Sequence, residues 1–254
     1  MTADSRKAIF LDIDGTLVAD GGKPSRYDAD RLMEAKSLGH MVFLNTGRSY
    51  AFIPDSLRDA PFVDGIVAGG GAHVLLGGRT LYHRTIAEDL LCEISALYLR
   101  IGKWCQFEGE TDNYRVVDNG TMKVVTSADD FRTRYRGALI SKITMEGCVS
   151  PGEREVLGPW FDLYRMPGYS EGIIRGESKT RGIRRILEAV GIPIENTVGI
   201  GDSANDVEMI RSVAFGIAMG NGVAELKQAA KAVTDDCQNN GVGKAIRKYV
   251  LKQG

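Results

Sequence analysis

Residues 7–68 alternate between short, continuously apolar segments and amphipathic stretches of helical length. Strands without polar alternation are buried on both faces, which is the pattern of a parallel sheet covered by helices. Gly39 stands where the first of these helices should end, because glycine is favoured just past a helix C-terminus. The β-α-β-α-β order therefore predicts a layered α/β core. The expected strands are 7–12, 41–44 and 65–68, and the expected helices are 25–38 and 49–59.

The pattern changes after residue 68. Gly77-Gly78 separates two short apolar segments, 74–76 and 80–82, as in a β-hairpin. Helices then mix with short paired strands, which is typical of an α+β domain. The expected helices are 87–101, 128–135 and a short one that starts at Pro151, and the expected strands lie near 104–107, 114–117, 139–145, 161–165 and 172–174.

The first pattern returns at Ser178. Strands are expected at 197–200, 214–218 and 232–233, and helices at 179–190, 205–211, 223–229 and 242–251. The simplest topology is one α/β core, residues 1–85 plus 175–254, interrupted by an inserted α+β domain, residues 86–174. Such an insertion is tolerated where the loops of the core lie at the surface. The two chain crossings, near 84–87 and 172–178, are the expected hinges.

Composition and charge argue against several classes of function. The 254 residues include 32 Lys and Arg against 33 Asp and Glu, so nothing attracts the whole chain to nucleic acid or an acidic membrane. No apolar run reaches about 18 residues, and Asp12 and Asp14 interrupt the stretch that a signal peptide would need. Four cysteines without a CxxC pair indicate reduced thiols, so we expect a cytoplasmic protein. The histidines, His40, His73 and His83, lack the spacing of zinc ligands.

Carboxylates stand at the carboxyl ends of two expected strands, where open α/β sheets bind ligands. Asp12 and Asp14 follow the first strand and point to the same side if the backbone stays extended. Two like charges buried together require a cation or a proton, and oxygen ligands suit a hard ion such as Mg²⁺. Asp202, after a later strand, could complete an oxygen site with Asp12.

Two further segments offer groups for a phosphate. Thr46-Gly47-Arg48 follows the second strand and provides a hydroxyl, a backbone N–H and a fixed cation. Lys179 opens a helix just after the insert and could neutralise phosphate and carboxylate charge. Each segment is a weak signal alone.

Together these segments resemble the haloacid dehalogenase (HAD) superfamily, and more narrowly its Cof-type phosphatases of subfamily IIB with an α/β cap. The strings DIDGTL and GDSANDVEM carry the resemblance most specifically, with NTGR and Lys179 in the right order between them. The resemblance implies an α/β fold with a Rossmann-like parallel-sheet core and an inserted α+β cap. It also implies a Mg²⁺-dependent phosphatase that forms an aspartyl-phosphate.

The roles implied by the resemblance fall into two groups. The catalytic and phosphate-binding group is Asp12 as nucleophile, Asp14 as general acid/base, Thr46, Gly47 and Arg48 as phosphate ligands, and Lys179 as charge neutraliser. The Mg²⁺ group is Asp12, the backbone carbonyl of Asp14, Asp202, Asn205 and Asp206, the last two directly or through water.

The same residues argue against two nucleotide-binding functions and leave two other functions open. A dinucleotide fingerprint starting at Gly69 would need glycine where Val74 stands, and a nucleotide-triphosphate loop would need glycine in place of Ser178. A sugar phosphomutase, which shares the aspartyl-phosphate step, and a phospholigand-binding module without turnover remain alternatives. The expected partner is a small phosphorylated metabolite, a sugar phosphate above all, bound by a monomer or weak homodimer. The leaving group of this substrate should contact the cap, where the candidate cations, among which the sequence does not choose, are Arg115, Lys123, Lys142, Arg165 and Arg175.

Overall fold

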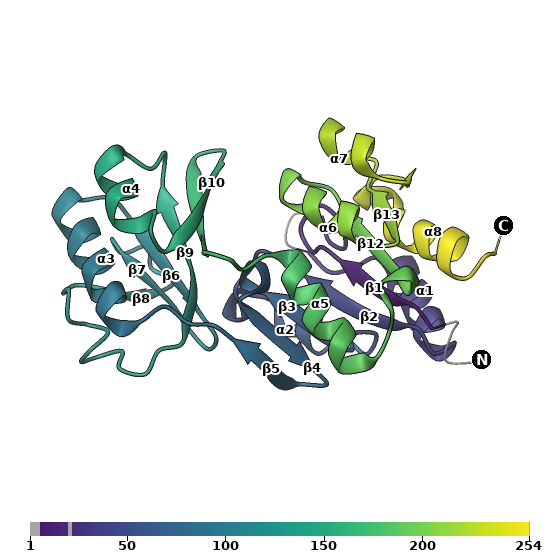
Figure 1. The fold of residues 1–254 in the computed structure, drawn as a ribbon, viewed down its shortest axis with the longest axis horizontal. Coiled ribbons are helices and arrows are strands. Elements are labelled where there is room, and N and C mark those ends of the chain that lie inside the picture. Colours follow the sequence, from purple (N-terminus) through teal and green to yellow (C-terminus); the bar gives the residue numbers. More distant parts are fainter. Residues whose placement is uncertain (1–5, 20–21, 254) are drawn as a thin grey trace.

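The computed structural model describes residues 6–19 and 22–253. Residues 1–5, 20–21 and 254 of the predicted core lie outside the described residues. Figure 1 shows two lobes joined by two crossings of the chain, and each lobe is built on one sheet, of eight and of six strands. The predicted α/β fold with a parallel-rich core sheet is confirmed.

The eight-stranded sheet forms the core lobe, with the order β14-β13-β12-β1-β2-β3-β4-β5. All neighbours from β14 to β3 run parallel, and β4 and β5 are added as an antiparallel hairpin. From β1 the chain adds β2 and β3 on one side of the sheet, and after the cap it adds β12, β13 and β14 on the other side. The topological switch point therefore lies at β1. The strands are β1 Ala8–Leu11, β2 Met41–Asn45, β3 Gly65–Ala68, β4 His73–Leu76, β5 Arg79–His83, β12 Thr197–Gly201, β13 Phe215–Ala218 and β14 Ala232–Val233.

Helices cover both faces of this sheet because its central strand is apolar on both sides. Ile9 and Leu11 pack in one buried cluster, and Ala8 and Phe10 pack in another on the opposite face. Residues of α1 and α8 belong to the first cluster, and residues of α5, α6 and α7 to the second. These helices are α1 Arg26–Ser37, α5 Lys179–Val190, α6 Val207–Ser212, α7 Ala224–Ala229 and α8 Gly241–Ala245.

The six-stranded sheet forms the cap lobe, with the order β10-β11-β9-β6-β7-β8. One face packs its apolar side chains against the helices α3 and α4. The alternate positions of β6, β9 and β11, such as Glu108, Lys142 and Glu171, are polar and line a cavity on the other face. The elements are α3 Glu88–Ile101, β6 Cys105–Gly109, β7 Asn113–Val116, β8 Lys123–Val124, β9 Ile140–Glu146, α4 Pro151–Leu157, β10 Phe161–Met166 and β11 Tyr169–Ile174.

Three helix predictions were wrong in part or whole. The stretch 49–59 is a 3₁₀ turn, Tyr50–Phe52, and a short helix α2, Asp55–Arg58, because Pro54 keeps the preceding residue extended. The stretch 128–135 forms turns, since the Asp130 carboxylate accepts the N–H groups of residues 126 and 127. The last helix changes to a π-helical turn at Ile246–Val250. In the described part of the chain, no helix is both long and apolar enough to cross a membrane.

Candidate active site

Three loops meet at one edge of the core sheet because β12, β1 and β2 are parallel neighbours. Leu11 is in register with Ile200 on one side and with Leu44 on the other. The loops that follow these strands therefore leave the sheet side by side. They bring Asp12, Thr46 and Asp202 to the switch point, where sheets of this kind bind ligands.

A buried acidic cluster forms the centre of this edge. Oxygens of Asp12, Asp202 and Asp206 all lie within 4.8 Å of one another. The ammonium group of Lys179, at the start of α5, lies 2.7 Å from Asp12 Oδ1 and 2.6 Å from Asp206 Oδ1. It also donates to Asn205 Oδ1 at 3.2 Å. The cluster thus holds three carboxylates against one ammonium, which pairs with two of them, and this leaves an excess of negative charge.

The pKa values reflect this excess. Burial raises the pKa of Asp12 to about 7, with Lys179 lowering it and Asp206 raising it further. Burial also raises the pKa of Asp202 to about 6. Burial alone would lower the pKa of Lys179, but Asp12 and Asp206 raise it above its usual range. A set of carboxylate oxygens with too little positive charge is the donor set that a hard divalent cation fits.

Asp206 fixes the positions of the Lys179 ammonium and of the loop that carries Asp202. Its Oδ2 accepts the backbone N–H groups of Asp202 and Ser203, both at 3.1 Å, while its Oδ1 faces Lys179. Thr16 donates to Asp202 Oδ1 at 2.9 Å and fixes that carboxylate from the other side. Sequence reasoning assigned no role to Thr16, although its place in the DIDGT string was an available signal.

Asp14 lies outside the buried cluster and pairs with Arg48. The guanidinium donates from Nε to Asp14 Oδ2 at 2.7 Å and from Nη2 to Oδ1 at 2.5 Å. Its Nη1 donates to the Phe52 carbonyl at 2.9 Å, and the Arg48 N–H donates to Thr46 Oγ1 at 3.1 Å. Arg48 was predicted as a phosphate ligand, and here it holds the Asp14 carboxylate.

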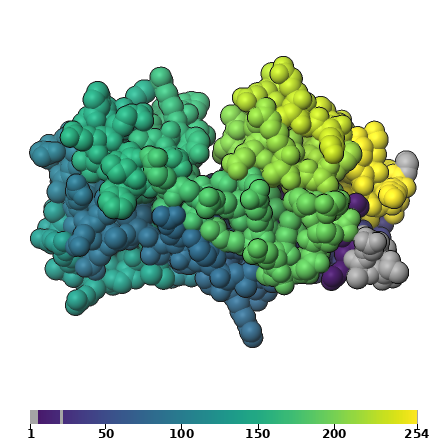
Figure 2. All heavy atoms as spheres, in the orientation of Figure 1, coloured from purple at the N-terminus to yellow at the C-terminus, as the bar shows by residue number. Residues whose placement is uncertain are grey.

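A cavity of about 280 Å³ opens between the lobes beside this cluster. Gly47, Lys179 and Asn205 line it from the core, and Tyr164 and Arg165 line it from the cap. Figure 2 shows the molecule hollowed between the lobes. A molecule bound in this cavity would lie between the acidic cluster and the cap.

A second cavity, also of about 280 Å³, lies between Arg48 and the polar face of the cap sheet. Buried Lys142 faces it and lies 2.6 Å from Glu171 and 3.8 Å from Glu108. Of the five candidate cap cations for the leaving group, Lys142 and Arg165 line these two cavities. The others have different partners: Arg115 stacks on Trp104, Lys123 pairs with Asp112, and Arg175 donates to the Gly158 carbonyl.

The class of protein follows from a family comparison. The sequence matches the family of haloacid dehalogenase-like hydrolases over residues 9–143 and 164–246. The protein therefore belongs to the haloacid dehalogenase-like hydrolase family, among the Cof-type members of subclass IIB.

Individual relatives of this chain within the family are phosphatases. The chain is 27% identical to the putative phosphatase YkrA of Bacillus subtilis, over 96% of this chain and 98% of that protein. It is 28% identical to phosphoglycolate phosphatase 1 of Saccharolobus solfataricus, over 97% and 95%. The structure of the HAD subclass IIB sugar phosphatase BT4131 superposes with a TM-score of 0.81 at 27% identity, covering 96% of this chain and 98% of that one. The protein is accordingly a phosphatase of this family.

Proposed function

We propose that this phosphatase is a Mg²⁺-dependent phosphomonoester hydrolase that acts on a small sugar phosphate through an aspartyl-phosphate on Asp12. The observation that carries the proposal is the buried Asp12 carboxylate, held at 2.7 Å by Lys179 at the edge of the inter-lobe cavity. A fixed carboxylate beside a fixed cation is what an attack on an anionic phosphate needs.

Side chains of this protein carry out each bond-making and proton-transfer step of the proposed reaction. An oxygen of Asp12 attacks phosphorus while the bond to the leaving alkoxide breaks. Asp14 gives its proton to the alkoxide and then takes one from the water that attacks the aspartyl-phosphate. That second attack releases inorganic phosphate and restores Asp12. In this structure Arg48 donates to both oxygens of Asp14, so at least one of these hydrogen bonds must break when Asp14 carries the proton that it gives.

The oxygen donors of the cluster fit Mg²⁺, and we assign its ligands to Asp12, the backbone carbonyl of Asp14, and Asp202. When bound, Mg²⁺ would offset the charge of the phosphate and the carboxylates. Asp206 has both oxygens occupied by hydrogen bonds, so we assign it to positioning Lys179 and the Asp202 loop. Asn205 shares the Lys179 ammonium and belongs to the same supporting group.

Thr46 and Gly47 are assigned to the substrate phosphate, with Lys179 on its other side. The cap supplies the contacts to the rest of the substrate. Both cavities have the size of a small metabolite, and the cap contributes the side chains of Arg165, Glu171 and Tyr164, which can hydrogen-bond to hydroxyl groups. A sugar phosphate is favoured because BT4131, a sugar phosphatase, shares this architecture.

The test is a panel of sugar phosphates and other phosphorylated metabolites incubated with the protein and Mg²⁺. Free phosphate and the organic product are both measured. We expect phosphate and the dephosphorylated sugar in equal amounts. An isomeric sugar phosphate without free phosphate would show a phosphomutase, and binding without any product would show a phospholigand-binding module.

A further inference from the structure

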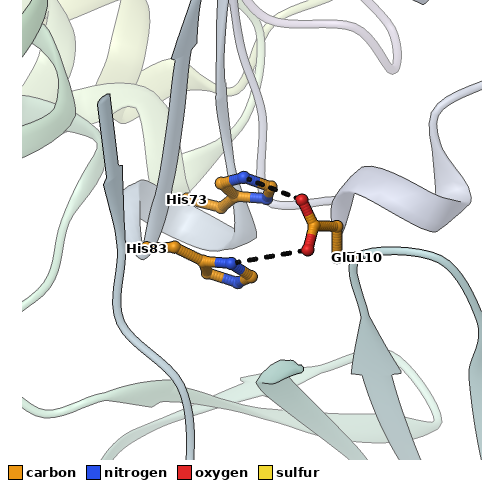
Figure 3. A group of neighbouring side chains, drawn as sticks. All are labelled: His73, His83 and Glu110. Atoms are coloured by element: carbon orange, nitrogen blue, oxygen red, sulfur yellow. Dashed lines mark ion pairs between the residues drawn. The ribbon is translucent and has the colours of Figure 1, made fainter. Parts of the chain in front are cut away.

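The first chain crossing leaves the core beside a loose contact between the lobes. His73 opens β4 and His83 closes β5, and their rings stack at a centroid distance of 3.8 Å with 7° between the ring planes. Glu110 of the cap faces both rings (Figure 3), but its oxygens lie 3.7 and 3.9 Å from the ring nitrogens. Both distances are longer than a hydrogen bond, so this contact holds the cap only weakly against the core.

A much tighter group of charges lies on the core side of the crossings, around Glu177. The side chain of Glu177 is 1% exposed. Its Oε2 lies 2.7 Å from Arg185 Nη1, and its Oε1 accepts the Tyr82 hydroxyl at 2.7 Å. The Arg185 guanidinium stacks on the Tyr82 ring, 3.6 Å from its centroid, and donates to the Gly71 carbonyl at 3.1 Å. Glu177 therefore ties together β5, α5 and the turn after β3.

Arg84 brings the two crossings into the same group. Its Nη1 lies 3.4 Å from Glu177 Oε1 and donates to the Arg175 carbonyl at 2.9 Å. The Glu177 carboxylate thus faces two guanidiniums and a hydroxyl. A buried carboxylate is costly unless it is paired, so these partners keep Glu177 in place.

In the first crossing, one residue separates the part bonded to the core from the part bonded to the cap. The Arg84 N–H donates to the Ala72 carbonyl of the core at 2.8 Å. The Ile86 N–H donates to the Ile140 carbonyl of the cap at 2.7 Å. Thr85 lies between these two anchored residues and is the pivot of this crossing.

The second crossing is built in the same way. The Arg175 N–H donates to the Trp160 carbonyl of the cap at 2.8 Å. Gly176, with a φ of +83°, alone separates Arg175 from the core-bound Glu177. Domain hinges absorb their movement in a few such residues, so the cap can turn about Thr85 and Gly176.

The group around Glu177 also fixes the start of α5, which carries the Lys179 ammonium. Glu177 precedes Lys179 by two residues, and Ser178 between them caps the helix. The Ser178 carbonyl lies against Gly71, where an added Cβ would be 2.1 Å from it. A shift of the backbone at Glu177 would therefore move Lys179 away from Asp12, from which its ammonium lies 2.7 Å.

We propose that Glu177 is a positioning residue for the phosphatase reaction. Its carboxylate fastens the core ends of both crossings to α5, so that Lys179 stays against Asp12 while the cap moves about its two pivots. This role rests on the proposed function, which assigns Lys179 to the substrate phosphate. Displacement of a catalytic group by about 1 Å can cost about 100-fold in rate. When the lost interaction is made only in the transition state, kcat and kcat/KM fall together.

The test is steady-state kinetics of Glu177→Gln, at a temperature well below the thermal midpoint measured for the variant. Two substrates are compared, a sugar phosphate that the wild type turns over and p-nitrophenyl phosphate, whose leaving group lacks the hydroxyls that the cap would bind. We expect kcat to fall by at least about 10-fold with both substrates, with KM unchanged. Glu188→Gln removes an exposed carboxylate from the same helix and serves as the matched control, with wild-type kinetics.

Arg185→Met gives a second route to the same interaction if Glu177→Gln fails to fold, because Arg185 is partly exposed. We expect the same loss of kcat with both substrates. In the double variant the loss should be no greater than in the worse single variant, because both changes remove one interaction.

Two outcomes would overturn the role of Glu177 alone. The first is a less stable Glu177→Gln with wild-type kcat for both substrates, since the carboxylate would then only stabilise the fold. The second is a loss confined to the sugar phosphate, since the carboxylate would then align the cap and not Lys179. Wild-type turnover by Lys179→Met would be a different failure, because it would overturn the role of Lys179 in the proposed function and with it that of Glu177.

Discussion

Gly15 directly follows Asp14 and lies against the side chain of Asp202. Replacing Gly15 with alanine therefore tests how tightly the acidic cluster is packed. Its φ is +75°, a left-handed conformation that costs an L residue roughly 1–2 kcal/mol. A Cβ at this position would lie 2.8 Å from Cγ of Asp202, so that carboxylate must move. Such overpacking adds about 1–3 kcal/mol. We therefore expect Gly15→Ala to lower the free energy of unfolding by about 2–5 kcal/mol.

The control for this variant is Gly78→Ala. Gly78 has a nearly identical φ of +76°, but a Cβ there meets nothing within 4 Å. It should lose only the conformational term, about 1–2 kcal/mol. Urea unfolding of both variants separates the two contributions.

Activity gives the second readout of the same comparison. Displacement of a catalytic group by about 1 Å can cost about 100-fold in rate. We expect kcat/KM to fall by about that factor in Gly15→Ala, with weaker Mg²⁺ activation, and to stay at the wild-type value in Gly78→Ala. Equal stability and equal activity of the two variants would refute the packing of Asp202 described here.

Three further predictions concern the metal, the pH dependence and the cap. Removal of divalent ions with EDTA should abolish phosphate release, and excess Ca²⁺ should inhibit it because Ca²⁺ takes longer bonds, about 2.3–2.6 Å against about 2.0–2.1 Å; full activity in EDTA would contradict the metal requirement. Burial lowers the pKa of His40, whose Nδ1 accepts the Lys7 N–H at 3.1 Å. The unfolded chain therefore binds a proton there before the folded one, and stability should fall as pH drops below about 6.5, less steeply in His40→Gln; equal slopes in urea unfolding would exclude this. Arg165→Met should change kcat/KM ratios between sugar phosphates by roughly 1–3 kcal/mol of discrimination, whereas Lys123→Met should not; unchanged ratios in both would remove Arg165 from the substrate site.

The core could be predicted because its strands are apolar on both faces and follow one another in a simple order. That order alone brings the ends of the strands preceding Asp12, Thr46 and Asp202 to one edge. Lys179 joins them because α5 begins at this residue, shortly after the chain returns from the cap, as the sequence indicated. These features depend on backbone topology, which hydrophobic patterning reports well.

The features that the sequence did not predict depend on which of several possible partners a side chain contacts in the folded protein. Arg48 could serve a phosphate or a carboxylate, and only the folded loop shows that Asp14 lies within reach. The pairing of His73 with His83 depends on hairpin register, which includes an irregularity after Val74. The failed helix at 128–135 reflects local competition, because the Asp130 carboxylate satisfies backbone groups that a helix would otherwise need.

The measurement that tests the central claim most directly is chemical trapping of the intermediate. The protein is mixed with a reactive substrate that it turns over, quenched, and reduced with borohydride, which converts an aspartyl-phosphate to homoserine. Peptide mass spectrometry then locates the change. We predict homoserine at position 12 alone, and neither trapping nor turnover in Asp12→Asn, with stability unchanged or raised because a charge leaves the crowded cluster. Trapping at another residue, or near-wild-type phosphate release by Asp12→Asn, would contradict the account.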